Sequence, residues 1–391
     1  MIETQNICIF VPKINLSMEE IKVYMNKTII TALLLILTLG AKGEQKTDCQ
    51  INVEVSETVE LMGILSRTAG FQEYCHDLAG EYTKDTEAWF APHKTHPTIA
   101  YYQDLRANCG ISYEKVTNMA IHLEINKGKV KFVGDKAELT NGWQNADIDE
   151  FVKRLNQFYT DTRFHEFFEQ HQAFYAEALR MYQVNVMPTF HPEWYTRFYY
   201  GTEPTEQFRV ILSFTHGKNN NGAWRQLPGK PREVYAVCGY WIDPAKGRPR
   251  YEPQLLFHEI CHAFVNPLLD DTANLAMIED AGRKLFQFSQ VAMTRQAYNN
   301  WQTVINESLV RAAVIINLLD NGFNQKQVGA ILTSETLYNE FRWMPELVTA
   351  LRHYAANRDK YKTFNDYYPE ISKCLTDYIN AETERMMKAI R

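Results

Sequence analysis

Apolar side chains recur at three- and four-residue spacing along most of this chain, as they do in helices that bury one face. The pattern runs from Glu57 through Leu65 and returns in later stretches of the first half. These further predicted helices cover roughly residues 75–90, 97–108, 112–123, 147–158 and 161–183. The run Ile51 to Val55 precedes them and predicts a first strand. After Pro253 the helical pattern continues to the C-terminus.

The middle of the chain has a different pattern. Three segments, Trp194 to Tyr200, Phe208 to Thr215 and Val234 to Trp241, are rich in aromatic and β-branched residues, which favour strands. The turn-forming stretch Gly217 to Gly222 separates the second from the third. The sequence therefore predicts a small antiparallel sheet at about residues 194–241, between two helical regions. This order is typical of a predominantly helical α+β fold.

No internal repeat, low-complexity tract or linker rich in proline, glycine and serine interrupts the chain after residue 43. We therefore expect residues 44–391 to form a single domain. Its N-terminal helical part is expected at residues 44–190, and the sheet with the helices that follow it at residues 191–391. Hydrophobic residues make up 45% of the 391, which is enough to build a sizeable core.

The start of the chain has the pattern of a secretory signal peptide. A short apolar run, Ile29 to Leu39, follows Lys27 and precedes small residues. The run is shorter than the roughly 20 residues that a membrane-spanning helix needs. We therefore predict a signal peptide at residues 25–43 and an exported, periplasmic or extracellular protein, with no integral membrane span in the mature chain. Residues 1–24 are then an overrun before a true start at Met25.

The charge of the chain excludes one class of partner. Its formal net charge is -6 and its pI is near 6.0, with no long run of one sign. Such a surface does not attract the phosphate backbone of nucleic acids. We therefore expect no nucleic-acid partner.

The strongest chemical signal is the segment His258 to His262, an HExxH motif within an apolar helical pattern. Residues four apart lie on one face of a helix, so both imidazoles can reach one zinc ion at about 2.0–2.1 Å. Glu259 then lies beside the metal and can accept a proton from its bound water. Pro253 near the start and Asn266-Pro267 at the expected end suit a helix here. The alternative is an ordinary buried helix, but two histidines and a glutamate are costly to bury without a partner.

A catalytic zinc site needs a third protein ligand and an open position for water. Glu307 is the preferred candidate, because it lies inside a strongly apolar helical pattern from about Thr294 to Leu319. Arg311, four residues later, can pair with Glu307 on the helix surface, which is the interpretation without a metal. Glu279 competes for the role of ligand, since it follows His262 at a spacing closer to that of several zinc hydrolases.

These segments resemble the gluzincin group of zinc metallopeptidases, typified by thermolysin, in which two histidines and a distant glutamate bind zinc. Asn306-Glu307 is similar to the Asn-Glu ligand segment of that group, although its distance from the motif is longer than in thermolysin. The segments HExxHxxxNP and NExLVRA are also similar to a family of uncharacterised exported bacterial proteins. The resemblance implies zinc as the cofactor, with His258, His262 and Glu307 as ligands and Glu259 as the general base.

We therefore expect a zinc-dependent hydrolase, most simply a metallopeptidase that cleaves peptide or amide bonds. His216, Tyr240 and Tyr298 are candidates for stabilising the oxyanion. One of the two strands just before the motif is expected to bind an extended peptide by edge pairing. The alternative is a non-catalytic binding module on the same scaffold, which a closed fourth metal ligand would favour.

Overall fold

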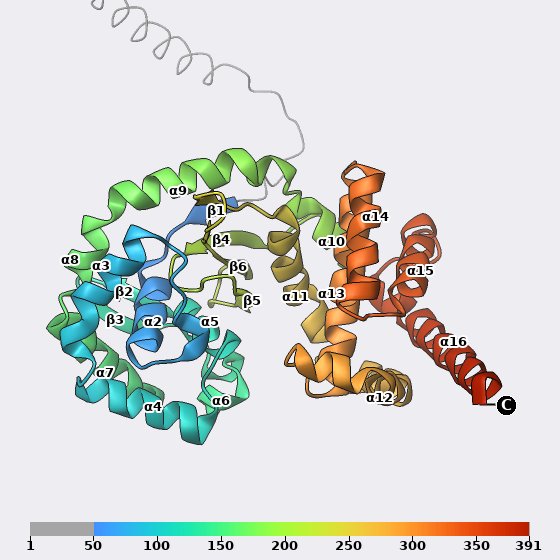
Figure 1. Ribbon diagram of the computed structural model, residues 1–391, viewed down its shortest axis with the longest axis horizontal. Coiled ribbons are helices and arrows are strands. Elements are labelled where there is room, and N and C mark those ends of the chain that lie inside the picture. The colour runs from blue at the N-terminus through green and yellow to red at the C-terminus, as the bar shows by residue number, and fades with distance from the viewer. Residues whose placement is uncertain (1–50, 391) are drawn as a thin grey trace, which may run out of the picture. The chain divides into compact units, whose positions relative to one another are not determined.

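Helices form most of the described chain, which is residues 51–390 of the computed structural model (Figure 1). The predicted signal peptide and the segment before it lie outside the described residues. The prediction of a predominantly helical fold with a small sheet is confirmed. None of the helices within residues 51–390 has both the length and the apolarity that crossing a membrane requires.

The first half of the chain forms a group of helices around a central, largely buried helix α2 (Glu57–Thr68). The others are α3 (Glu81–Phe90), α4 (Pro97–Cys109), α5 (Glu114–Ile121), α6 (Asn141–Gln144), α7 (Ile148–Asp161), α8 (Phe164–Gln170), α9 (Gln172–Asn185) and α10 (Pro192–Tyr200). Sequence analysis did not predict the hairpin of β2 (Leu123–Asn126) and β3 (Lys129–Phe132). Lys127 and Gly128 form its turn with positive φ angles of 51° and 72°, as a two-residue hairpin turn requires.

The main sheet has four strands in the order β1-β4-β6-β5. They are β1 (Ile51–Glu54), β4 (Gln207–Ser213), β6 (Glu233–Gly239) and β5 (Asn220–Arg225). The first three are parallel and only β5 is antiparallel, so the prediction of an antiparallel sheet was wrong. Nearly every residue of β4 and β6 is buried, as expected for strands with helices on both faces. A separate two-stranded ribbon joins β7 (Ile242–Asp243) to β8 (Arg248–Pro249).

The strand predicted at Trp194 to Tyr200 is instead helix α10. Pro192 occupies its first turn and Gly201 ends it with a φ of 71°, which are ordinary helix boundaries. Trp194 and Phe198, four residues apart, stack with ring centroids separated by 4.4 Å. The aromatic residues therefore pack along one face of a helix. A prediction based on residue type alone missed their four-residue spacing.

The sheet has β1 at one edge and β5 at the other, and β5 begins inside the stretch predicted as a turn. Both β4 and β6, the strands expected to bind a peptide, lie in the interior of the sheet. Their backbone groups are paired on both sides, so the hypothesis of edge pairing by either strand was wrong.

Helix α11 (Pro253–Asp270) carries the HExxH segment and packs against β5 and β6. It does not end at Asn266-Pro267 as predicted, because Pro267 lies inside it. A proline at this position leaves the carbonyl of Ala263 without its helical donor. The Nη2 of Arg232 donates to that carbonyl at 2.8 Å, so a side chain satisfies the group and the helix continues.

The C-terminal helices lie on the side of α11 away from the sheet (Figure 1). They are α12 (Thr272–Arg295), α13 (Trp301–Asp320), α14 (Gln325–Thr333), α15 (Met344–Ala356) and α16 (Phe364–Ile390). The helix predicted from Thr294 begins only at Trp301. Ala297 has a φ of 67°, which breaks the helical path, and the Asn300 side chain caps the new helix by accepting from the backbone of Thr303 at 2.8 Å.

Candidate metal centre

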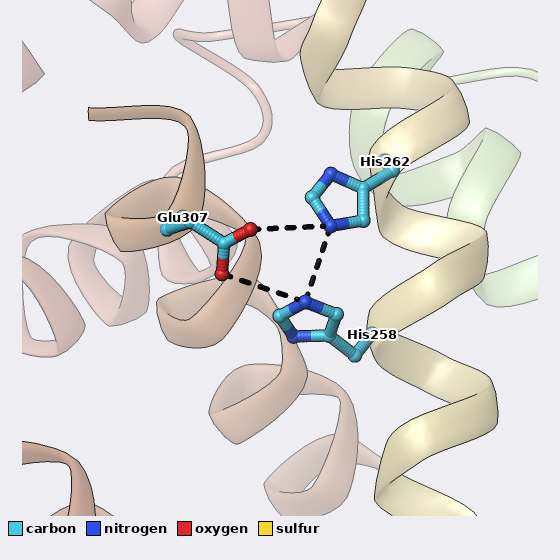
Figure 2. A group of neighbouring side chains, drawn as sticks. All are labelled: His258, His262 and Glu307. Carbon is cyan, nitrogen blue, oxygen red and sulfur yellow. Dashed lines mark hydrogen bonds and ion pairs between the residues drawn. The ribbon is translucent and has the colours of Figure 1, made fainter. Parts of the chain in front are cut away.

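Three predicted site residues converge between α11 and α13, which pack against each other. Figure 2 shows His258 and His262 of α11 facing Glu307 of α13. The two imidazole Nε2 atoms are 3.1 Å apart. The Nε2 of His258 is 3.6 Å from one carboxylate oxygen of Glu307, and the Nε2 of His262 is 3.5 Å from the other. No other group of this kind occurs within residues 51–390.

These separations suit a tetrahedral metal ion. Two donor atoms at about 2.0–2.1 Å from one zinc ion lie roughly 3.3 Å apart in that geometry. Two imidazole nitrogens and one carboxylate oxygen are also the donor set of many catalytic zinc sites. The two imidazoles and the carboxylate therefore suit a zinc ion held between α11 and α13.

The orientation of His262 is set by two asparagines. Its Nδ1 lies 3.2 Å from Oδ1 of Asn266 and 3.1 Å from Oδ1 of Asn306, and Nδ2 of Asn306 donates to Oδ1 of Asn266 at 2.9 Å. A proton on Nδ1 leaves the Nε2 lone pair facing Glu307, as a metal ligand requires. Sequence reasoning missed this contact, and the only signal was the position of the asparagines within the two motif segments.

Two of the candidate ligands, His258 and Glu307, carry the protonation states that metal binding needs. Burial lowers the pKa of His258 to about 3, which keeps the imidazole neutral. Burial by itself would raise the pKa of Glu307, but the neighbouring imidazoles and the Arg311 guanidinium outweigh it and hold that pKa at about 2. A neutral imidazole and an ionised carboxylate can bind a cation without first losing a proton.

Glu259 lies on α11 between the two histidines in sequence but does not join their group. Only 6% of its surface is exposed. Burial raises its pKa to about 7, while a hydrogen bond from the backbone of Gly222 favours the ionised form. A carboxyl group with a pKa near neutrality can both accept and return a proton.

Glycine at position 222 is required by the approach of β5 to α11. A Cβ atom there would lie 2.0 Å from the backbone oxygen of Glu259 and 2.9 Å from Cβ of His262. Any side chain would therefore push the edge strand away from the motif turn. The close contact places the backbone of β5 directly beside the candidate general base.

Glu307 has further partners on its own side of the site. The hydroxyl of Tyr298 donates to its Oε2 at 3.2 Å, and Nη2 of Arg311 lies 3.3 Å from the same oxygen. Arg311 also donates to the Tyr298 hydroxyl at 3.0 Å and to Oε2 of Glu335 at 2.7 Å. The predicted pairing of Glu307 with Arg311 is therefore present together with the convergence on the histidines.

The structure separates the competing residues from the site. Glu279 pairs with Arg283 on the surface of α12 at 2.7 Å and is not part of the histidine group. His216 is buried between Ser213 and Thr117, with its ring nitrogens 2.6 and 3.2 Å from their hydroxyls. Tyr240 packs in an aromatic cluster. Of the three oxyanion candidates, only Tyr298 contacts a residue of the metal group.

Comparison with known proteins gives one match. A family model described as Domain of unknown function (DUF4932) matches residues 49–374. This range includes the three converging residues and Glu259. No curated protein and no solved structure matches the chain.

Proposed function

The chain belongs to the DUF4932 family, and we propose that it is a zinc-dependent hydrolase, most simply a metallopeptidase that cleaves peptide or amide bonds. The observation that carries this proposal is the convergence of His258, His262 and Glu307, with Glu259 one residue from the first ligand. That arrangement has the donor set and the neighbouring carboxylate of zinc hydrolases. It also supports the resemblance to gluzincins, which we propose as the functional relationship.

A catalytic role is better supported than a purely binding one. Within the described residues, no fourth histidine, cysteine, aspartate or glutamate joins the group. The fourth position of a tetrahedral ion is then left for water, as in catalytic sites and unlike closed structural sites. A non-catalytic binding module therefore lacks the feature that would favour it.

The residues around the site have complementary roles in the proposed reaction. When bound, zinc lowers the pKa of its water toward about 7 and polarises the scissile carbonyl. Glu259 would serve as the general base that accepts a proton from the attacking water and passes it to the leaving amine. In the proposed reaction the Tyr298 hydroxyl, which donates to Glu307 in this structure, turns its hydrogen bond to the carbonyl oxygen as negative charge develops. Burial raises the pKa of Tyr298 to about 12, so the hydroxyl remains a donor at neutral pH.

The edge strand β5 supports an extended peptide as the substrate. Its outer edge is not paired with another strand of the described chain, and its Gly222 touches the HExxH turn. A peptide added to this edge would lie beside Glu259, with its backbone held by strand pairing. We further propose that the protein is exported, on the basis of the apolar segment near its start.

The first test of catalysis is Glu259→Gln in the purified, zinc-loaded protein. The substitution keeps the shape of the side chain but removes the proton acceptor. We expect the zinc content to stay at the wild-type level and peptide hydrolysis to fall by roughly 10²–10⁴-fold. Glu177→Gln, on the exposed surface of α9, is the matched control and is expected to retain full activity. Equal hydrolysis by Glu259→Gln and the control would contradict the proposed role of Glu259.

A further inference from the structure

Arg311 of α13 lies between two carboxylates, one of which belongs to the third candidate metal ligand. Its Nη2 is 3.3 Å from Oε2 of Glu307, one helical turn away on the same face of α13. Its Nη1 donates to Oε2 of Glu335 at 2.7 Å, from the segment that joins α14 to α15. The contact with Glu335 is the shorter of the two, so the residue that is not a candidate ligand holds the guanidinium more closely.

The guanidinium of Arg311 could bind Glu307 more fully than it does. Within residues 51–390, its Nε atom has no hydrogen-bond partner. Nε and Nη2 lie on one edge of the guanidinium, and two donors on an edge match the two oxygens of a carboxylate. A turn of Arg311 toward Glu307 would therefore pair with both carboxylate oxygens. Each of these oxygens faces one of the two histidines, so such a contact would compete with a metal ion for the same atoms.

Glu335 is itself held in a position that opposes this turn. It lies in a single π-helical turn, Ser334–Tyr338, in which the backbone N–H of Asn339 donates to the carbonyl of Ser334 at 3.0 Å. The Nδ2 of Asn339 also donates to Oε2 of Glu335 at 2.8 Å. Only 15% of the Glu335 side chain is exposed, so solvent ions screen its attraction for Arg311 only weakly.

The charges of this group show how Glu335 affects a metal ion. Metal binding requires neutral imidazoles, so the three candidate ligands contribute one negative charge, on Glu307. Arg311 cancels that charge, and Glu335 restores one net negative charge to the connected group. A divalent cation is attracted to a negatively charged group more strongly than to a neutral one. The charge of Glu335 and its hold on Arg311 therefore favour metal binding in the same direction.

We infer that Glu335 is a positioning residue for the metal, because its pairing with Arg311 keeps the guanidinium from occupying the Glu307 carboxylate. Glu335 is not part of the metal group and acts through Arg311. This inference rests on the proposed function. It adds to the proposed centre a residue that lies outside both the HExxH and the NExLVRA segments.

Zinc dissociation constants of the full-length mature protein test this inference. They are measured by competition with a chromophoric chelator, on protein first stripped of metal. Glu335→Gln keeps the shape of the side chain and removes its charge, and we expect it to weaken zinc binding by roughly 10–100-fold. Glu340→Gln is the matched control and is expected to bind zinc as the wild type does. Glu340 lies in the same connecting segment but pairs with Arg295 at 2.8 Å and Arg342 at 3.2 Å, outside the metal group.

Arg311→Gln separates the proposed role from a direct effect of the Glu335 charge. Without the guanidinium, Glu335 has nothing to hold back, so adding Glu335→Gln to Arg311→Gln should change the zinc dissociation constant by less than about twofold. Arg311→Gln alone should bind zinc more tightly than Glu335→Gln alone.

Three results would overturn this inference and leave the proposed function standing. They are equal zinc affinity in the wild type and Glu335→Gln, a loss from Glu335→Gln that persists in the Arg311→Gln background, and weaker zinc binding by Arg311→Gln than by Glu335→Gln. A wild type that takes up no zinc would overturn the proposed function and this inference with it.

Discussion

Glu307 and three other side chains, Tyr298, Arg311 and Glu335, form a connected polar group. Tyr298 and Arg311 both contact its Oε2 atom, and Arg311 extends the connection to Glu335. The guanidinium also lies 4.9 Å from the centre of the Phe341 ring. Arg311 therefore holds the third candidate ligand and the tyrosine hydroxyl in one arrangement, with contacts on several sides of its plane. This arrangement leaves Tyr298 positioned before a substrate binds.

The proposed role of Tyr298 predicts the effect of removing its hydroxyl oxygen. In Tyr298→Phe the candidate ligands are unchanged, so we expect the zinc content of the wild type. Loss of one donor to the developing negative charge should reduce kcat by roughly 10²–10³-fold. Tyr240→Phe, which alters a candidate distant from the metal group, should leave kcat unchanged. Steady-state kinetics on a peptide substrate would refute the assignment if the two variants behaved alike.

At the scale of elements, the sequence predicted helices best where apolar residues recur with helical spacing throughout a segment. The helical patterns near residues 57–65, 97–108 and 147–158 correspond to α2, α4 and α7. At Trp194 to Tyr200 the prediction failed because it rested on the strand preference of aromatic residues and ignored their helical spacing. Elsewhere it failed because a tertiary contact decides the structure. The polar stretch Gly217 to Gly222 contains the start of an edge strand because β6 and α11 are beside it.

For the candidate site, too, the sequence predicted what depends on spacing along the chain but not what depends on contacts between different helices. The HExxH spacing and the apolar surroundings of Glu307 favoured the three residues that converge, while Glu279 remained an alternative until the structure separated it from the histidines. The sequence did not predict how His262 is oriented by Asn266 and Asn306, because those contacts join two different helices.

Gly222 tests whether the spacing between β5 and α11 matters. Gly222→Ala places a Cβ against the Glu259 carbonyl, and we expect a loss of about 1–3 kcal/mol in the free energy of unfolding. Gly329→Ala is the matched control. Position 329 lies within α14, where an added Cβ meets nothing within 4 Å, and alanine should stabilise it by about 0.5–1 kcal/mol. Urea unfolding measures both, and a neutral Gly222→Ala would contradict the packing described.

At the scale of the whole molecule, the two halves of the chain build the site together. The first strand, β1, pairs with β4 from the middle of the chain, and α5 supports the strand that touches α11. A buried carboxyl, Glu60 of α2, accepts hydrogen bonds from Tyr82 at 2.6 Å, Ser213 at 2.7 Å and the backbone of Phe214 at 3.0 Å. It therefore joins the N-terminal helices to the central sheet.

Glu60 gives the stability of the whole fold a defined dependence on pH. Burial raises its pKa in the folded chain, although its hydrogen bonds oppose the shift. Folding thus favours the protonated form, and its stabilising contribution is complete below the unfolded pKa near about 4.3 and lost as pH rises through the folded pKa. Glu60→Gln removes this loss. The free energy of unfolding of the variant relative to the wild type should therefore increase as the pH rises above the unfolded pKa. A constant difference would show that Glu60 does not titrate in this way.

The most direct test of the account is the zinc content of the purified mature protein by elemental analysis, beside Glu307→Ala and Glu279→Ala. We predict about one zinc ion per chain in the wild type and in Glu279→Ala, because Glu279 pairs with Arg283 on the surface of α12 and is not part of the histidine group. Glu307→Ala should lose most of its zinc. A wild type that takes up no zinc even after reconstitution, or a Glu307→Ala variant that keeps a full complement, would contradict the proposed centre.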